Sequence, residues 1–350
     1  MFKKMKTISK LVPVVALTAL GLLTANVSSA QQLTRVTFVS PSPSAINSFQ
    51  IFVAMGEGYF KDEGIEIKAE AVNGSGPVLQ ALTSGQAQLG RPGPAPLLKA
   101  RARGVDAVFV YNSLPRTSFG ILVKTGSNYK LPSDLKGKTI GVGTADGAEV
   151  GFARSILGSY NMKEPQDYKF IAVGDGGPAT AGFLRGDIEA YVGSIADAAI
   201  LNSRGMKVRD VTPDKFQVLF GNGYAMMGDY IKKNPKIVEG VGRAMVRATI
   251  FARNPANRDK VLQHLAAGNR QEIEDKNFAN ALLDAQLAKG LPFDESKGWG
   301  YNEPSAWQNW HDSMLKEKEL EAPLKDLAAA YTNAFVPLGT PKSECTDIES

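Results

Sequence analysis

The stretch Lys138-Thr139-Ile140-Gly141-Val142-Gly143-Thr144-Ala145-Asp146-Gly147 decides the fold, because a short apolar strand runs directly into a polar, glycine-rich loop. The same arrangement returns twice: Lys169–Val173 leads into Gly174-Asp175-Gly176-Gly177-Pro178, and Ala190–Val192 leads into Gly193-Ser194. A strand, a polar glycine loop and a helix, repeated along a chain, predict an α/β protein with mostly parallel sheets.

Outward from this stretch, strand and helix patterns continue to alternate towards the N-terminus. Strands are predicted at Arg35–Val39, Ile65–Ala71, Val108–Tyr111 and Phe119–Val123, with helices over Phe49–Gly58 and from Ser75 onward. The C-terminal third is helical, with helices predicted over 234–254, 257–267, 276–289, 304–319 and 324–331. We expect two α/β lobes joined by crossing strands, since no linker separates them.

Length and composition narrow the class of protein. The chain has 350 residues, of which 43% are hydrophobic, enough for two cores of ordinary size. The single cysteine, Cys345, excludes an internal disulfide, and two histidines, His264 and His311, leave little for a metal site. The dinucleotide and phosphate-loop fingerprints are incomplete, so we expect no cofactor, no metal and no catalytic residues.

The first thirty residues are typical of a secretory signal. Lys3, Lys4, Lys6 and Lys10 precede the apolar run 11–23, and Val27-Ser28-Ser29-Ala30 offers a small-residue cleavage site. The alternative is a membrane anchor, but a run of this length covers about 20 Å of a hydrocarbon core about 30 Å thick. We therefore expect residues 1–30 to be removed and the remaining chain to reside in an exported compartment such as the periplasm, without membrane insertion.

Removing this signal also changes the charge. The whole chain has a formal charge of +5 from 40 basic and 35 acidic residues, and the signal holds four of the basic residues and no acid. The remaining chain is therefore nearly neutral. Nucleic-acid binding loses its main electrostatic support, and we expect no nucleic-acid partner.

Four segments carry a family resemblance. They are 54–67 (AMGEGYFKDEGIEI), 82–90 (LTSGQAQLG), 131–142 (LPSDLKGKTIGV) and 183–190 (FLRGDIEA). In this order they resemble the nitrate/sulfonate/taurine-type periplasmic substrate-binding proteins of ABC importers, a group that includes thiamine-precursor binders. Gln88 and Glu189 stand where the family usually has Asp. From the residues alone, these segments are scaffold.

The resemblance implies the two-lobed periplasmic-binding-protein fold of type II, with the ligand cleft between two mostly parallel, helix-flanked sheets. Lobe I would comprise residues 31–115 and 222–350, and lobe II residues 116–221. The chain would cross near Ser113–Phe119 and Phe220–Tyr224, with Phe119–Val123 and Tyr224–Met227 as paired crossing strands.

The function that the resemblance implies is capture of a small polar or anionic organic molecule and its delivery to the permease of an ABC importer. A sulfonate, an aromatic carboxylate or a pyrimidine-like molecule would fit. The protein would act as a monomer and would not be an enzyme. Two alternatives stay open: a ligand-sensing protein for a membrane receptor, and an enzyme on the same fold, related to a fungal pyrimidine-forming enzyme whose cysteine-rich motif this chain lacks.

Ligands in such folds lie at the carboxyl ends of strands, where free helix N-termini can bind anions or polar groups. This predicts as ligand contacts Ser42, Ser44, Asn47, Phe49, Ser75, Gly76, Arg91, Tyr111, Asn112, Thr144, Asp146, Gly147, Asp175, Ser194, Asp197 and Tyr224. The aromatic members would suit a larger, partly flat molecule.

Three of these interpretations carry explicit alternatives. Arg91 either holds a carboxylate or sulfonate through its guanidinium, or faces solvent from its loop. Asp197 either meets a ligand amine or caps a helix locally. Sugar stacking is one interpretation of Trp299, Tyr301, Trp307 and Trp310, whereas the spacing of Trp307, Trp310 and Met314 favours a packed helix face.

Overall fold

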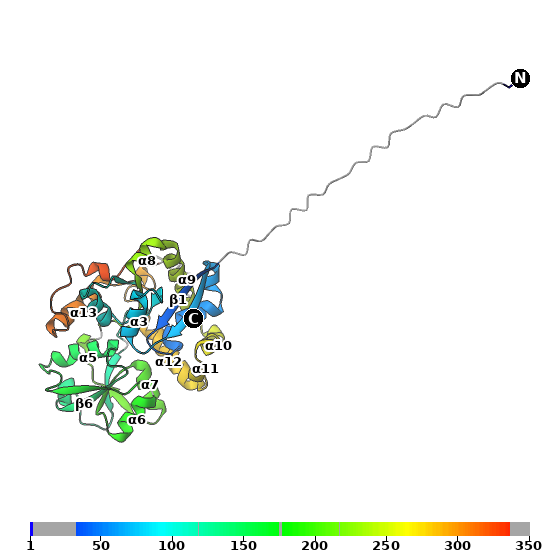
Figure 1. The fold of residues 1–350 in the computed structure, drawn as a ribbon. Helices are drawn as coiled ribbons and strands as arrows, with labels where there is room; N and C mark the ends of the chain where they lie inside the picture. The colour runs from blue at the N-terminus through cyan, green and yellow to red at the C-terminus, as the bar shows by residue number, and fades with distance from the viewer. Residues whose placement is uncertain (3–32, 118, 175–176, 217, 337–350) are drawn as a thin grey trace. The chain divides into compact units, whose positions relative to one another are not determined.

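Two five-stranded sheets organise the structure, which is a computed structural model (Figure 1). The structure describes residues 1–2, 33–117, 119–174, 177–216 and 218–336. Both sheets belong to one compact unit that begins at Leu33. The predicted signal peptide therefore lies almost entirely outside the described residues.

The first sheet has the strand order β2–β1–β3–β10–β4, and the second has the order β7–β6–β8–β5–β9. The first consists of β1 (Thr34–Ser40), β2 (Ile65–Ala71), β3 (Leu89–Gly90), β4 (Ala107–Tyr111) and β10 (Tyr224–Met227). The second consists of β5 (Phe119–Lys124), β6 (Lys138–Val142), β7 (Tyr168–Ala172), β8 (Ala190–Ser194) and β9 (Val208–Asp210). The predicted α/β fold class with two helix-flanked sheets is confirmed, and each sheet combines parallel with antiparallel pairings.

Helices flank both sheets. Before β10 they are α1 (Phe49–Gly56), α2 (Tyr59–Asp62), α3 (Ser75–Thr83), α4 (Pro94–Ala102), α5 (Ala148–Gly158), α6 (Gly177–Arg185) and α7 (Ile195–Ser203). The remainder are α8 (Gly228–Lys233), α9 (Pro235–Arg253), α10 (Arg258–Gly268), α11 (Arg270–Ile273), α12 (Lys276–Lys289) and α13 (Pro304–Lys316).

The prediction that Phe119–Val123 and Tyr224–Met227 pair with each other is wrong. β5 pairs antiparallel with β8 and β9 of the second sheet, whereas β10 pairs antiparallel with β3 and β4 of the first. The backbone N–H and C=O groups of each strand thus form their hydrogen bonds within the sheet that the chain has just entered. The other ladders, β1 with β2 and β3, and β6 with β7 and β8, are parallel.

One apolar cluster joins the two sheets. It contains Leu97 and Phe109 from the first-sheet side, Val142 and Phe152 from the second, and Trp307 of α13. Phe109 and Val142 are strand residues, whereas Leu97, Phe152 and Trp307 lie on the buried faces of α4, α5 and α13. The two lobes therefore share buried apolar surface along α4, α5 and α13.

The packed-face interpretation of α13 is confirmed. Trp307 and Trp310 are fully buried, and the Trp310 indole Nε1 donates to the Phe220 carbonyl oxygen at 3.1 Å. The helix predicted over 324–331 is absent, because the Leu324 N–H donates to His311 Nε2 at 3.1 Å and Tyr331 stacks on Trp307. Only the short turn Ala328–Ala330 is helical in that segment.

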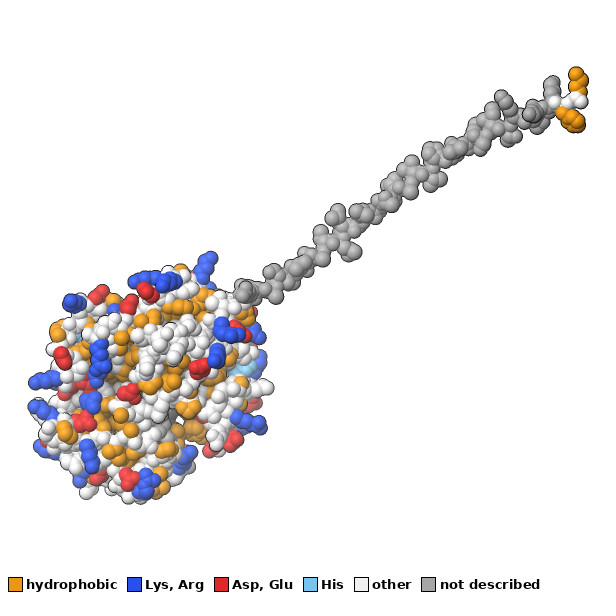
Figure 2. Space-filling model, in the orientation of Figure 1, with side chains coloured by type: hydrophobic (Ala, Val, Ile, Leu, Met, Phe, Trp, Pro, Cys, Tyr) orange, Lys and Arg blue, Asp and Glu red, His pale blue; other side chains and the backbone are white. Residues whose placement is uncertain are grey.

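Charged side chains of both signs are interspersed over the face drawn in Figure 2. On that face, lysine and arginine side chains of the described residues alternate with acidic ones and do not gather into a patch. Among the helices of the described residues, none combines the length and the apolar character needed to cross a membrane.

Candidate functional site

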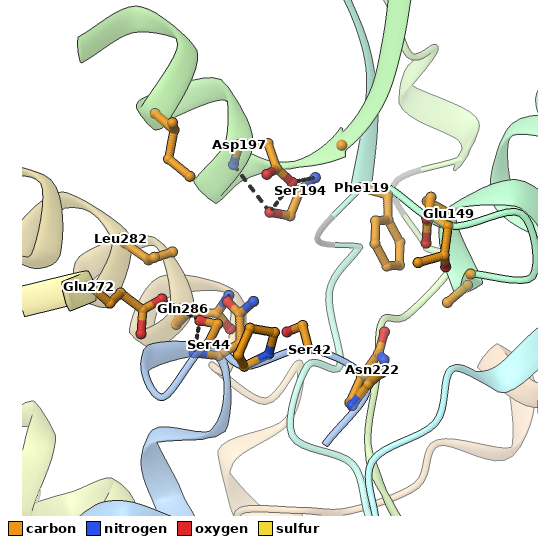
Figure 3. A pocket seen from close by; sticks show the side chains of 18 of the residues that line it. Ser42, Ser44, Phe119, Glu149, Ser194, Asp197, Asn222, Glu272, Leu282 and Gln286 are labelled. Atoms are coloured by element: carbon orange, nitrogen blue, oxygen red, sulfur yellow. Dashed lines mark hydrogen bonds between the residues drawn. The ribbon is translucent and has the colours of Figure 1, made fainter. Parts of the chain in front are cut away.

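A cavity of about 680 Å³ lies between loops that follow strands of both sheets (Figure 3). We call it the cleft. Its polar wall comprises Ser42, Ser44, Asn47, Ser75, Arg91, Thr144, Glu149, Ser194, Asp197, Arg204, Asn222, Asn269, Gln271, Glu272, Asp275 and Gln286. Its apolar wall includes Leu114, Phe119, Val192, Ile200, Phe278 and Leu282.

The loop after β1 forms one side of the cleft, and the C-terminal helices hold it in place. The Ser44 hydroxyl donates to Glu272 Oε1 at 2.5 Å, and the Ile46 N–H donates to Glu272 Oε2 at 3.1 Å. Gln286 Nε2 donates to Asn47 Oδ1 at 2.8 Å. Burial raises the pKa of Glu272, and the bonds from Ser44 and Ile46 partly oppose this rise.

Arg91 lies on the cleft wall directly after β3 and is only 4% exposed. Its Nε has no hydrogen-bond partner, and among the described residues no carboxylate forms an ion pair with it. Burial lowers the pKa of Arg91, whereas its contact with the Tyr224 hydroxyl raises it. That hydroxyl donates onward to Gln50 Oε1 at 3.1 Å. The solvent-facing alternative for Arg91 is therefore excluded.

The opposite wall comes from the second sheet. Ser194 caps α7, and Asp197 Oδ2 accepts from the Ser194 N–H at 2.7 Å and from its hydroxyl at 2.8 Å. The Thr144 N–H donates to Glu149 Oε1 at 3.1 Å, which folds this carboxylate back onto its own loop. Asp197 thus caps the start of α7, which is one of the two roles predicted for it. Its side chain also faces the cleft (Figure 3).

Most of the predicted contact residues lie on the cleft wall. They are Ser42, Ser44, Asn47, Ser75, Arg91, Thr144, Gly147, Ser194 and Asp197. Asp175 lies outside the described residues. Gly76 and Asp146 are off the wall but bond to each other beside it, Gly76 N to Asp146 Oδ2, at 3.1 Å.

The aromatic residues predicted to contact the ligand do not line the cleft. Phe49, Tyr111 and Asn112 line a separate small cavity, and Tyr224 is fully buried beneath Arg91. Burial raises the pKa of both tyrosines. Tyr224 lies on β10, inside the first sheet, and Tyr111 ends the edge strand β4. Both side chains pack into the apolar core of this sheet. Phe119 and Phe278 supply the aromatic surface of the cleft instead.

Sequence reasoning missed the wall that α11 and α12 contribute. It comprises Asn269, Gln271, Glu272, Asp275, Phe278, Leu282 and Gln286. Glu272 meets Ser44 across 228 positions of sequence, and no local pattern signals such a contact. Among the described residues, no group of three or more His, Cys, Asp or Glu is arranged to hold a metal ion.

These features define the class of two-lobed periplasmic-binding-protein folds with a cleft between the sheets. The chain is similar to the solved alkanesulfonate-binding protein SsuA of Xanthomonas axonopodis pv. citri bound to MOPS, with a TM-score of 0.66 and 17% identity. The match covers 85% of this chain and 98% of that one, and it establishes the fold.

Sequence comparison identifies the family. The family described as NMT1/THI5 like matches residues 45–258, more than half of the chain, and the chain belongs to it. It is 27% identical to the riboflavin-binding protein RibY of Chloroflexus aurantiacus, over 83% of this chain and 82% of that protein. It is 28% identical to the 4-amino-5-hydroxymethyl-2-methylpyrimidine phosphate synthase THI13 of Saccharomyces cerevisiae, over 90% of this chain and 92% of that protein.

Proposed function

We propose that this protein is an exported solute-binding protein that captures a small polar organic molecule in the cleft and delivers it to the permease of an ABC importer. Residues 31–115 with 222–350 would form one lobe and residues 116–221 the other, and residues 1–30 would direct export to the periplasm. The fold and the family support this proposal, as do the solute-binding names of two similar proteins.

The single observation that carries the proposal is Arg91. A buried guanidinium without a counter-charge costs several kcal/mol, and proteins normally pair such a group or give it a function. Arg91 lines the cleft with an unpartnered Nε, so an acceptor group on a ligand would complete its hydrogen bonding. A sulfonate, a carboxylate or a ring carbonyl would each provide that acceptor.

The dimensions of the cleft support an organic ligand. Pockets for such molecules measure about 300–1,000 Å³ and combine apolar walls with a few polar groups. The cleft, at about 680 Å³ with Phe119 and Phe278 on its wall, falls in this range. A partly flat molecule the size of an aromatic carboxylate, a pyrimidine or a flavin would bury its faces there.

A pyrimidine-forming enzyme is the second candidate, because fungal relatives bear such a name. The composition of the cleft wall favours a binding protein over an enzyme. Its described residues include no histidine, cysteine or lysine that would act as a nucleophile or neutral base. Incubating the protein with candidate substrates and finding an altered product would favour the enzyme.

A thermal-shift screen of residues 31–350 tests the proposal. The panel would contain sulfonates, aromatic carboxylates, pyrimidines and riboflavin. A ligand present at 100 times its Kd stabilises the folded protein by about 2.7 kcal/mol. We expect at least one class to stabilise the wild type and not Arg91→Ala, whereas Arg103→Ala, at an exposed position, keeps the shift. A shift that survives Arg91→Ala would place the ligand outside the cleft.

A further inference from the structure

The protein's own carboxylates already occupy helix N-termini around the cleft. Beside it, the Gly76 N–H at the start of α3 donates to Asp146 Oδ2 of the other lobe at 3.1 Å. At α12, Asp275 Oδ1 accepts from the N–H groups of Asn277 and Phe278 at 3.0 and 3.1 Å. These helix ends carry partial positive charge, and the carboxylates neutralise it.

Carboxylates also accept backbone N–H groups at the start of α7 and at the turn before α1, and Figure 3 shows the first of these contacts. Asp197 lies in the first turn of α7 and accepts from the Ser194 N–H. Glu272 accepts from the Ile46 N–H, at the start of the turn that leads into α1. A sulfonate or nitrate binds a helix N-terminus through free N–H groups. At α3 and α12 a carboxylate of the protein already accepts from such groups, and at the start of α7 the Asp197 carboxylate adds negative charge.

The charge of the cleft wall also disfavours an anionic ligand. Four carboxylates and two guanidiniums line the cleft: Glu149, Asp197, Glu272, Asp275, Arg91 and Arg204. A further anion would sit among like charges in a partly desolvated space, which is unfavourable. An ionised carboxylate has about four lone-pair positions for hydrogen bonds. Glu272 fills part of this capacity with Ser44, Ile46 and Ala45, and the remainder suits an N–H or O–H donor of a ligand.

Arg91 is the exception in this acidic surrounding. It is 4% exposed, its Nε is unpartnered, and it lies on the wall of the cleft. Its Nε therefore requires one acceptor from the ligand. A neutral carbonyl oxygen supplies this hydrogen bond, and it does so without bringing a negative charge next to the wall carboxylates.

We propose that the cleft binds an uncharged ligand that donates hydrogen bonds to the wall carboxylates and offers one acceptor to Arg91, and that it rejects sulfonate, carboxylate and inorganic anions. This rests on the proposed function and narrows its ligand to molecules with amide, imide or amino-carbonyl edges. It also separates this chain from what its likeness to a sulfonate-binding fold would suggest.

Matched probes of one shape test the proposal. Benzamide and benzoate form one pair, benzenesulfonamide and benzenesulfonate a second, and nitrate serves as the inorganic anion. Binding is followed by protein NMR shifts at constant ionic strength in mildly alkaline buffer. We expect each amide to bind at least tenfold more tightly than its anion, which corresponds to about 1.4 kcal/mol. Equal or tighter binding of the anions to the wild type overturns the proposal, and so does the absence of any amide binding.

A charge-neutralised variant supplies the second readout. Asp146→Asn, Glu272→Gln and Asp275→Asn are combined, because these changes keep the side-chain size and free the helix ends of negative charge. We expect the triple variant to gain benzenesulfonate and nitrate binding and to lose its preference for the amides. The control combines Asp229→Asn, Asp259→Asn and Glu321→Gln, all exposed and away from the cleft, and should behave as wild type.

The outcomes separate this inference from the proposed function. Tight binding of an anion in the cleft of the wild type would sustain solute binding and overturn the uncharged-ligand inference. A triple variant that folds, by circular dichroism, but gains no anion binding also overturns it. Failure of every probe and every solute in the wider screen would count against both.

Discussion

At the scale of single residues, we expect Arg91 to lower the stability of the unliganded protein while it contributes to ligand binding. Its guanidinium is buried, touches the Tyr224 hydroxyl and lacks an ionic partner among the described residues. A group kept in this state weakens the unliganded fold, and binding sites commonly accept such a cost.

Replacing Arg91 with an uncharged side chain of similar length should therefore separate the two properties. We expect Arg91→Met to raise the free energy of unfolding of the unliganded protein by about 1–3 kcal/mol and to abolish ligand-induced stabilisation. Urea unfolding with and without ligand measures both effects. The exposed Arg103→Met should change stability by no more than about 0.5 kcal/mol. A marked loss of stability in Arg91→Met would show that the arginine is mainly structural.

Tyr224 acts through Arg91, since its hydroxyl donates to Gln50 and lies against the guanidinium. We expect Tyr224→Phe to weaken ligand binding several-fold through a misplaced Arg91 and to cost about 1 kcal/mol of stability. Isothermal titration of the ligand found in the screen measures this. Tyr111→Phe is the matched control, because Tyr111 is equally buried and its hydroxyl bonds to Thr249 away from the cleft. Equal losses of affinity in the two variants would show that Tyr224 does not position Arg91.

At the scale of elements, the loop after β1 depends on helices from the far end of the chain. Glu272 of α11 and Gln286 of α12 bond to Ser44, Ile46 and Asn47 of this loop. The helices therefore shape the cleft without belonging to either sheet.

The raised pKa of Glu272 gives this contact a pH signature. A carboxyl that binds its proton more tightly in the folded than in the unfolded chain adds stability at low pH. That contribution is lost as pH rises from the unfolded value near 4.5 through the higher folded value. Glu272→Gln removes this pH dependence, so the variant should gain stability relative to wild type between acidic and neutral pH. Urea unfolding across that range tests it, with Glu274→Gln as the exposed neighbouring control. A constant difference between variant and wild type would contradict the prediction.

The sequence was most informative about local elements. Ile65–Ala71 and Lys138–Val142 are strands with the predicted bounds, because alternation and strand-forming residues act locally. The loops after strands also lie where predicted. The C-terminal wall and the burial of Tyr224 were not predictable, since both depend on contacts between distant segments such as Ser44 with Glu272.

At the scale of the whole molecule, the two lobes are tied together on one side of the cleft. The shared apolar cluster runs along α4, α5 and α13, and Glu319 after α13 pairs with Lys99 of α4 at 2.6 Å and with Arg154 of α5 at 3.7 Å. The facing helices α7 and α12 contact each other on the second side. A motion that admits ligand would separate α7 from α12 and preserve the shared cluster.

Distances between spin labels can locate this motion. In a Cys345→Ser background, labels at Leu184 of α6 and Lys276 of α12 report on the side where α7 meets α12. Labels at Ala102 and Lys163 report on the side of α4 and α5. All four positions are exposed. We expect ligand to shorten and narrow the first distance and to leave the second unchanged. A change confined to the second pair would reverse the assignment of the hinge.

The position of β10 also sets an order of events during folding. This strand lies between β3 and β4, yet it is made more than a hundred residues after them, once the whole second sheet has been synthesised. Until Tyr224–Met227 arrives, the edges of β3 and β4 that will bond to it stay unpaired, whereas the second sheet already has all of its strands. The second lobe should thus be the earlier folding unit, and a chain interrupted before β10 would expose those edges to aggregation.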